Sequence, residues 1–191
     1  MKIVKDYTKP HLGGNALNGD PGSRCISSWK YIIEKYNIKS VLDVGSGIGH
    51  SAKWFSDYGL DTTAMDGLEY NVKNSLYPTI LFDLTEGYLE AQVDLINCTE
   101  VVEHIKEDYL DNLMLTLTQG KYVLITHALP GQGGHHHVNL KPSSYWISEF
   151  EKRGYELVEE DVIKIKELAK IDRAVHIVNS GLFFKKVNKI L

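Results

Sequence analysis

Residues 41–49 read Val-Leu-Asp-Val-Gly-Ser-Gly-Ile-Gly, an apolar run that ends in three glycines at alternate positions. The apolar run predicts a buried β-strand, and the glycines predict a tight turn that a ligand can approach closely. A helical pattern begins directly after the turn, at His50. A strand, a glycine turn and a helix in this order are typical of nucleotide sites in α/β sheets. The stretch therefore predicts an α/β fold with a nucleotide-like ligand at the end of this strand.

Short apolar runs and helical patterns alternate outward from this stretch. The expected strands cover residues 40–44, 61–65, 79–82, 93–97 and 122–126, with two more at 155–158 and 180–187. The expected helices cover residues 23–36, 50–58, 105–117 and 143–153, and a charged stretch at 161–170 separates the last two strands. This rhythm predicts a Rossmann-like, doubly wound α/β fold with a mainly parallel seven-stranded sheet and one antiparallel strand.

The composition indicates one globular domain preceded by a short arm. Residues 1–23 are rich in Gly, Asn, Pro and Asp and are expected to be irregular, whereas residues 24–191 hold the domain. Cys25 and Cys98 fit no disulfide or zinc pattern, which favours a reducing, cytoplasmic setting. We see no secretory signal and no apolar run of ~20 residues, so no membrane association is expected.

The charge balance bears on the class of partner. A net charge of −4 disfavours a dedicated nucleic-acid binder, which usually carries a basic face, but it leaves binding of a short RNA end open. A basic run at 164–173 is more typical of a solvated helix face than of a phosphate site. The oligomeric state is left undetermined by the sequence.

The acidic residue before the glycines separates two kinds of ligand. A dinucleotide fingerprint, Gly-x-Gly-x-x-Gly, needs a glycine where this chain has His50. Asp43 would repel a pyrophosphate but suits the sulfonium and amino group of S-adenosylmethionine (SAM). Asp66 ends the second strand, where it suits ribose hydroxyls, and Asp83 follows the third strand, where it suits the adenine amino group. The pattern favours SAM over NAD.

A second group of polar residues follows the fourth and fifth strands. If Thr99 caps a helix, then Glu100, Glu103 and His104 share one face of its first turn. A histidine loop at 127–139 emerges from the same sheet edge. Carboxylates and imidazoles in one cleft predict a divalent metal site or an acid/base site. A structural role stays open, because acidic residues are favoured in the first turn of any helix.

The stretch from Val41 to about Trp146 resembles class I SAM-dependent methyltransferases of the small single-domain kind. The matching pieces are residues 41–49, 65–67, 82–84 and 98–104. The resemblance implies SAM binding within residues 24–191. The expected cofactor-binding residues are Asp43, Gly45, Ser46, Gly47, Gly49, Asp66, Gly67, Asp83, Leu84 and Thr99.

The pattern Glu-x-x-Glu-His at 100–104 is similar to two groups of metal-dependent O-methyltransferases. These are the ubiquinone-biosynthesis O-methyltransferases and the terminal 2′-O-methyltransferases of small RNAs. The resemblance implies a divalent metal ion held by Glu100, Glu103, His104 and His137, with His136 as the second choice for the last ligand. Carboxylates and imidazoles suit Mn, Fe, Co or Zn, and Mg stays open although it prefers an all-oxygen shell. The expected catalytic residues are Glu103, His104, His127 and His137.

These features together predict methyl transfer to a hydroxyl of a small molecule or carbohydrate. The acceptor site is expected beneath a lid formed by the arm (Tyr7, His11 and Asn15), the histidine loop and Tyr145–Trp146. Three alternatives stay open: an RNA-terminal or nucleoside 2′-O-methyltransferase, an NAD-type oxidoreductase, and a non-catalytic SAM-binding module.

Overall fold

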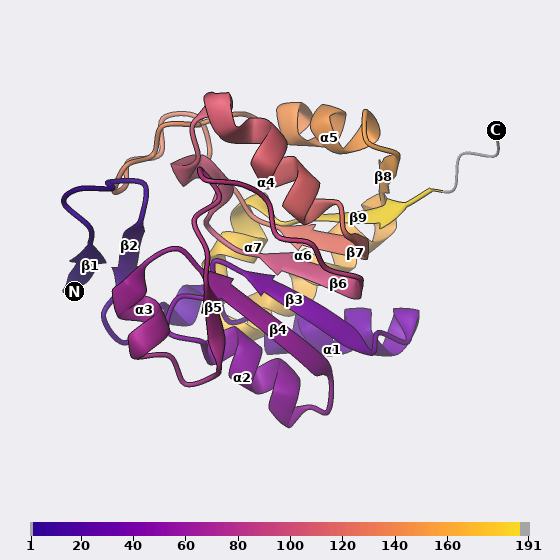
Figure 1. Cartoon of the computed structure of the whole chain (residues 1–191). Helices are drawn as coiled ribbons and strands as arrows, with labels where there is room; N and C mark the ends of the chain where they lie inside the picture. The colour runs from indigo at the N-terminus through magenta and orange to yellow at the C-terminus, as the bar shows by residue number, and fades with distance from the viewer. Residues whose placement is uncertain (1, 188–191) are drawn as a thin grey trace.

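The computed structural model describes residues 2–187, which form a central sheet covered by helices on both faces (Figure 1). The seven strands lie in the order β5-β4-β3-β6-β7-β9-β8. Their bounds are β3 Ser40–Val44, β4 Asp61–Asp66, β5 Thr79–Leu81, β6 Val93–Cys98, β7 Gly120–Ile125, β8 Tyr155–Leu157 and β9 Leu182–Lys186. Neighbours from β5 to β7 are parallel, and β9 runs antiparallel to both β7 and β8, so it is the one reversed strand of this sheet in the described residues. The predicted sheet, with its single reversed strand, is confirmed.

Alternate residues of the central strands face two separate cores. In β3, Val41 packs into one hydrophobic cluster and Leu42 into the other. Leu95 and Ile96 of β6 divide in the same way. Because both faces are buried, adjacent residues in the middle of these strands are apolar, as at Val41–Leu42 and Leu95–Ile96, where a half-exposed strand would alternate. This is why their positions could be predicted closely from the sequence.

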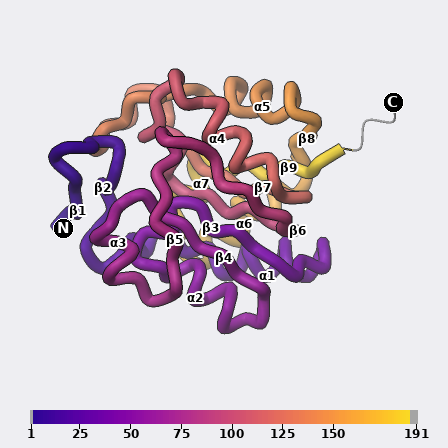
Figure 2. Tube along the Cα trace, viewed as in Figure 1, coloured from indigo at the N-terminus to yellow at the C-terminus, as the bar shows by residue number. Residues whose placement is uncertain are grey.

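The helices are shared between the two faces of the sheet. One face carries α1 Ile26–Tyr36, α2 His50–Asp57, α6 Glu159–Asp172 and α7 Val175–Ser180, and the other carries α4 Leu110–Leu117 and α5 Ser143–Glu151. The short helix α3 Glu69–Lys73 follows β4. Figure 2 shows the chain passing between these layers, with α4 and α5 above the sheet and α1 and α2 below it. Within residues 2–187, no helix is long and apolar enough to span a membrane.

The N-terminal arm is an ordered hairpin, contrary to the irregular segment expected. Strands β1 Ile3–Lys5 and β2 Gly13–Ala16 pair antiparallel, and a 3₁₀ turn, η1 Pro21–Ser23, follows. Gly13 allows this pairing, since its φ is +90° and a Cβ there would lie 2.6 Å from the carbonyl oxygen of Val4. The hairpin lies at the edge of the sheet where the parallel strands end (Figure 1).

Two helix predictions need correction. The helix expected over 105–117 begins only at Leu110, and two 3₁₀ turns precede it, η2 Val102–His104 and η3 Glu107–Tyr109. Thr99 does not cap a helix: among the described residues its hydroxyl has no hydrogen-bond partner, and Glu100 has a left-handed φ of +56°. The charged stretch at 161–170 is part of α6, a helix of 14 residues.

Candidate cofactor and metal site

A cavity of about 430 Å³ opens where the parallel strands end. The glycine turn, the hairpin, the histidine loop and the ends of β3, β4 and β6 line it. The predicted site residues that line it are Asp43, Gly45, Ser46, Gly47, Asp66, Gly67, Asp83, Leu84, Thr99, Glu100, His104 and His137. A volume of this order suits a small-molecule ligand. The fold therefore gathers most of the predicted residues around one space.

The glycine turn has the backbone conformation that its sequence predicts. Gly45, Gly47 and Gly49 have φ values of +67°, +58° and +78°, which favour glycine. A methyl group on Gly45 would overlap Val101, and one on Gly49 would overlap Ser75. Around Gly47, by contrast, the described part of the chain leaves nothing within 4 Å of that position. Gly47 thus exposes its backbone to the cavity.

Buried polar atoms beside this turn are left free to bind a ligand. Asp43 accepts a hydrogen bond from the Asn97 amide at 2.6 Å through Oδ1. In residues 2–187, Asp43 Oδ2, Ser46 Oγ and Thr99 Oγ1 are buried without a hydrogen-bond partner. Burial raises the pKa of Asp43 to about 6. Since buried polar atoms are normally satisfied, these three fit the polar groups of a bound molecule.

The other two acidic residues at strand ends differ in their partners. Asp66 accepts hydrogen bonds at 2.8 Å from the backbone amides of Gly47 and Leu68, and burial raises its pKa. Asp83 instead anchors the hairpin, because Lys9 Nζ and His11 Nε2 lie 3.0 Å from its oxygens. Burial alone would raise the pKa of Asp83, but hydrogen bonds from Thr85, Lys9 and His11 lower it to about 2.

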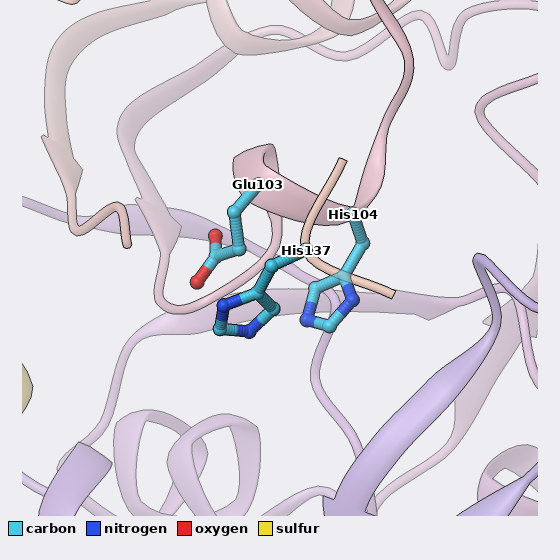
Figure 3. Close-up of side chains that lie close together, drawn as sticks. All are labelled: Glu103, His104 and His137. Atoms are coloured by element: carbon cyan, nitrogen blue, oxygen red, sulfur yellow. The ribbon is translucent and has the colours of Figure 1, made fainter. Parts of the chain in front are cut away.

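Glu103, His104 and His137 form a compact group of possible metal ligands (Figure 3). One ligand atom from each lies within 4.8 Å of the others. Both Glu103 carboxylate oxygens and His104 Nδ1 are buried and have no hydrogen-bond partner among the described residues. Burial and the neighbouring imidazole of His137 lower the pKa of His104 to about 4, and burial with the charge of Glu100 raises that of Glu103. A neutral imidazole is the form that binds a metal ion.

Backbone hydrogen bonds hold the histidine loop against Glu103. The carbonyl of Glu103 accepts hydrogen bonds from the amides of Val138 and Asn139 at 3.0 and 3.1 Å. A methyl group on Gly134 would overlap the His137 ring, so glycine is needed there. The structure brings His137 into the group and leaves out His136, which has a φ of +49°.

Glu100 and His127 are not among these three ligands, although the Glu100 carboxyl is close enough to raise the pKa of Glu103. Glu100 accepts a hydrogen bond from the Thr126 hydroxyl at 2.9 Å and lies 3.0 Å from His176 Nδ1. His127 is buried, and its Nε2 lies 3.0 Å from Ser143 Oγ, away from the cavity lining. Its place between β7 and α5 explains this, because the histidine loop reaches the cavity only farther along the chain.

The expected lid is correct in part. His11, Asn15 and the histidine loop line the cavity. Tyr7 is 93% exposed, Tyr145 packs against the core and Trp146 of α5 is buried in it, so none of the three lines the cavity. The indole of Trp146 lies on the core-facing side of its helix, where an apolar surface is needed.

Three further cavity residues were missed in the sequence. Asn97 holds Asp43, and Arg24 presents a guanidinium whose Nε is buried with no partner within the described part of the chain. His176 lies 2.7 Å from Asp20 Oδ2 through its Nε2. Burial alone would lower the pKa of His176, but hydrogen bonds to Glu100 and Asp20 raise it to about 9. Arg24 lies in the first turn of the helix expected over residues 23–36, which is a weak signal, and the sequence around His176 had none.

Solved structures share this fold. A SAM-dependent methyltransferase from Archaeoglobus fulgidus superposes with a TM-score of 0.62 at 16% identity, covering 88% of this chain and 96% of that one. Magnesium protoporphyrin IX methyltransferase from Synechocystis PCC 6803, solved with bound SAM, gives a TM-score of 0.55 at 15% identity, covering 70% of this chain and 68% of that one.

Sequence relatives point to the same family. The ubiquinone biosynthesis O-methyltransferase of Rickettsia typhi is 32% identical over 106 residues, which are 47% of this chain and 42% of that protein. The match thus spans less than half the length of this relative. A family model described as a methyltransferase domain matches residues 23–160. That match covers more than half of the sequence, and the chain therefore belongs to the methyltransferase-domain family.

Proposed function

We propose that this chain binds SAM in the cavity and transfers its methyl group to a hydroxyl acceptor. The observation that carries the proposal is the set of partnerless buried atoms Asp43 Oδ2, Ser46 Oγ and Thr99 Oγ1 beside the glycine turn, counted over the described residues. A carboxylate suits the cationic sulfonium and amino group of SAM. The methyltransferase names of the family and of the Archaeoglobus fulgidus structure support this ligand.

The strand order gives the direction in which SAM would lie. Asp66 is the last residue of β4, and Asp83 follows β5. These two residues mark the adenosine end. Asp43 in β3 and Thr99 after β6 mark the methionine end. The guanidinium of Arg24 is the group that suits the carboxylate of the methionine moiety. The methyl group would then point beyond β6, toward the histidine loop.

Glu103, His104 and His137 are the residues that would hold a divalent metal ion. One carboxylate and two imidazoles favour Mn, Fe, Co or Zn, whereas Mg prefers an all-oxygen shell. Bound SAM supplies an electrophilic methyl group, and a bound metal ion supplies a Lewis acid that lowers the pKa of an acceptor hydroxyl. The name of the Rickettsia typhi relative supports an oxygen acceptor.

The side chains themselves would align the acceptor and manage its proton. The neutral imidazole of His104 can accept a hydrogen bond or a proton from a hydroxyl in the cavity, and the ring of His137 lies beside it. The hairpin covers the same space through Gly13, Gly14 and Asn15 and limits the access of water. Methyl transfer depends mainly on this alignment, because SAM is already a strong electrophile.

We propose a small molecule as the acceptor. The name of the Rickettsia typhi relative supports a small-molecule acceptor, and neither Tyr7 nor Trp146 lines the cavity. This favours a small molecule or carbohydrate over an RNA terminus.

The experiment is a methylation assay with SAM, Mn²⁺ and a panel of catechol, sugar and amine acceptors, followed by mass spectrometry. With a hydroxyl compound we expect S-adenosylhomocysteine and a product heavier by about 14 mass units, the mass of one CH2 group. Turnover should be lost with EDTA or in His137→Ala. Turnover that survives both treatments would overturn the metal-assisted part. Transfer only to amines would overturn O-methylation.

A further inference from the structure

Two segments outside the family match meet at the cavity. The match ends at residue 160 and begins at residue 23, so Asp20 and the whole of α7 lie outside it. His176, in α7, joins these segments to the site. Its Nε2 lies 2.7 Å from Asp20 Oδ2, and its Nδ1 lies 3.0 Å from Glu100 Oε2. One imidazole therefore bridges two carboxylates, and all three residues line the cavity.

On one side, this bridge fixes the turn that carries Arg24. Asp20 Oδ1 accepts a hydrogen bond from the Gly22 amide at 2.8 Å and so caps η1, while Asp20 Oδ2 contacts His176. The turn packs closely on α7, because a Cβ on Gly22 would lie 3.0 Å from Val175 and 3.3 Å from His176. Arg24 follows directly, and its amide donates to the carbonyl at the start of the turn.

On its other side, the bridge fixes Glu100. This residue has a left-handed φ of +56°, and its amide donates to Thr126 Oγ1 at 2.8 Å. Its carboxylate accepts from the same hydroxyl and from His176. The Glu100 carboxylate is thereby held at the cavity wall, beside the group formed by Glu103, His104 and His137.

We propose that His176 is a positioning residue for the methionine end of SAM, acting on Arg24 through Asp20 and on the cavity wall through Glu100. This inference rests on the proposed binding of SAM. An imidazole is suited to the task because it carries two N–H donors on opposite sides of a rigid ring. An asparagine or glutamine amide places both of its N–H groups on one nitrogen and cannot span the two carboxylates.

The test compares two ligands that differ only at this end. S-adenosylhomocysteine carries the amino-acid portion, and 5′-deoxy-5′-methylthioadenosine lacks it. In His176→Asn we expect the Kd for S-adenosylhomocysteine to rise by about tenfold or more, which corresponds to about 1.4 kcal/mol. The Kd for methylthioadenosine should stay within about twofold of the wild-type value, because the adenosine contacts are remote from the bridge. The control is His136→Asn, at a histidine outside the ligand group.

A double-mutant cycle with Asp20→Asn tests the route through the turn. If the bridge acts as one unit, the double variant should bind S-adenosylhomocysteine no more weakly than His176→Asn alone. Equal weakening of both ligands, or no change in either, would overturn the positioning role. A thermal melt close to that of the wild type shows that the variant folds. Failure of the wild-type chain to bind S-adenosylhomocysteine would instead overturn the proposed function itself.

Discussion

The imidazole ring of His137 meets that of His104 edge to face, with ring centroids 5.1 Å apart and planes at 83°. Backbone hydrogen bonds from Val138 and Asn139 to the carbonyl of Glu103 hold the loop in this register. The position of the second histidine is therefore set by the same turn that carries the first.

Substituting Glu103, His104 or His137 should weaken metal binding while leaving SAM binding intact. In Glu103→Gln and His137→Ala we expect the affinity for Co²⁺ to fall by more than about tenfold. Removing a residue that only hydrogen-bonds to a metal ligand already costs about tenfold or more in metal affinity, and these two residues would bind the metal directly. Absorption spectroscopy of the Co²⁺ protein measures this. His136→Asn should behave like the wild type, and equal Co²⁺ affinity in all variants would contradict the assignment.

Two adjacent glycines of the histidine loop provide a matched pair. Gly134→Ala should displace the His137 imidazole and weaken Co²⁺ binding as His137→Ala does, because the new methyl group overlaps the ring. Gly133→Ala should be neutral, since no atom of the described chain lies within 4 Å of its Cβ position. Calorimetric titration of both variants with Co²⁺ makes the comparison. Similar behaviour of the two would show that His137 is not held as described.

Acid should release the hairpin through Asp83. The pKa of this carboxyl is lowered to about 2 from an ordinary 3.8, because the hydrogen bonds from Thr85, Lys9 and His11 outweigh the effect of burial. A lowered acid pKa means that the stabilisation is complete above pH 3.8 and is lost as the pH falls through 2. We expect the Tm of the wild type to fall more steeply over this window than that of Asp83→Asn. Parallel curves would argue against a folding role for this anchor.

Asp43 should control the affinity for SAM in a pH-dependent way. Burial raises the pKa of this carboxyl to about 6, so it is charged above that pH and neutral below it. SAM binding should therefore weaken as the pH falls from 8 to 5. Asp43→Asn should bind SAM weakly at every pH, with a flatter profile by calorimetry. A wild-type profile that is also flat would remove Asp43 from the site.

The sheet and the glycine turn were predictable because each is encoded locally. Strands buried on both faces carry adjacent apolar residues, as Val41–Leu42 and Leu95–Ile96 do, and the turn needs glycines at positive φ. Asp43 and Asp66 could be predicted as site residues for the same reason, since strand ends fix the place of their side chains.

The remaining parts of the site depend on contacts between distant segments. The hairpin is ordered by Asp83, which accepts hydrogen bonds from Lys9 and His11. Glu100 could not be placed from helical spacing, because its left-handed φ ends the regular pattern assumed for it. His176 reaches the cavity only through the packing of α7 on the η1 turn, for which the sequence has no local signal.

The central claim is that the cavity beside the glycine turn binds SAM. Calorimetric titration of the purified chain with SAM, and separately with NADH, tests it most directly. We expect one SAM bound per chain, with binding lost in a variant that combines Asp43→Asn and Asp66→Asn, and no heat of binding with NADH. Binding of NADH together with no binding of SAM would contradict the account.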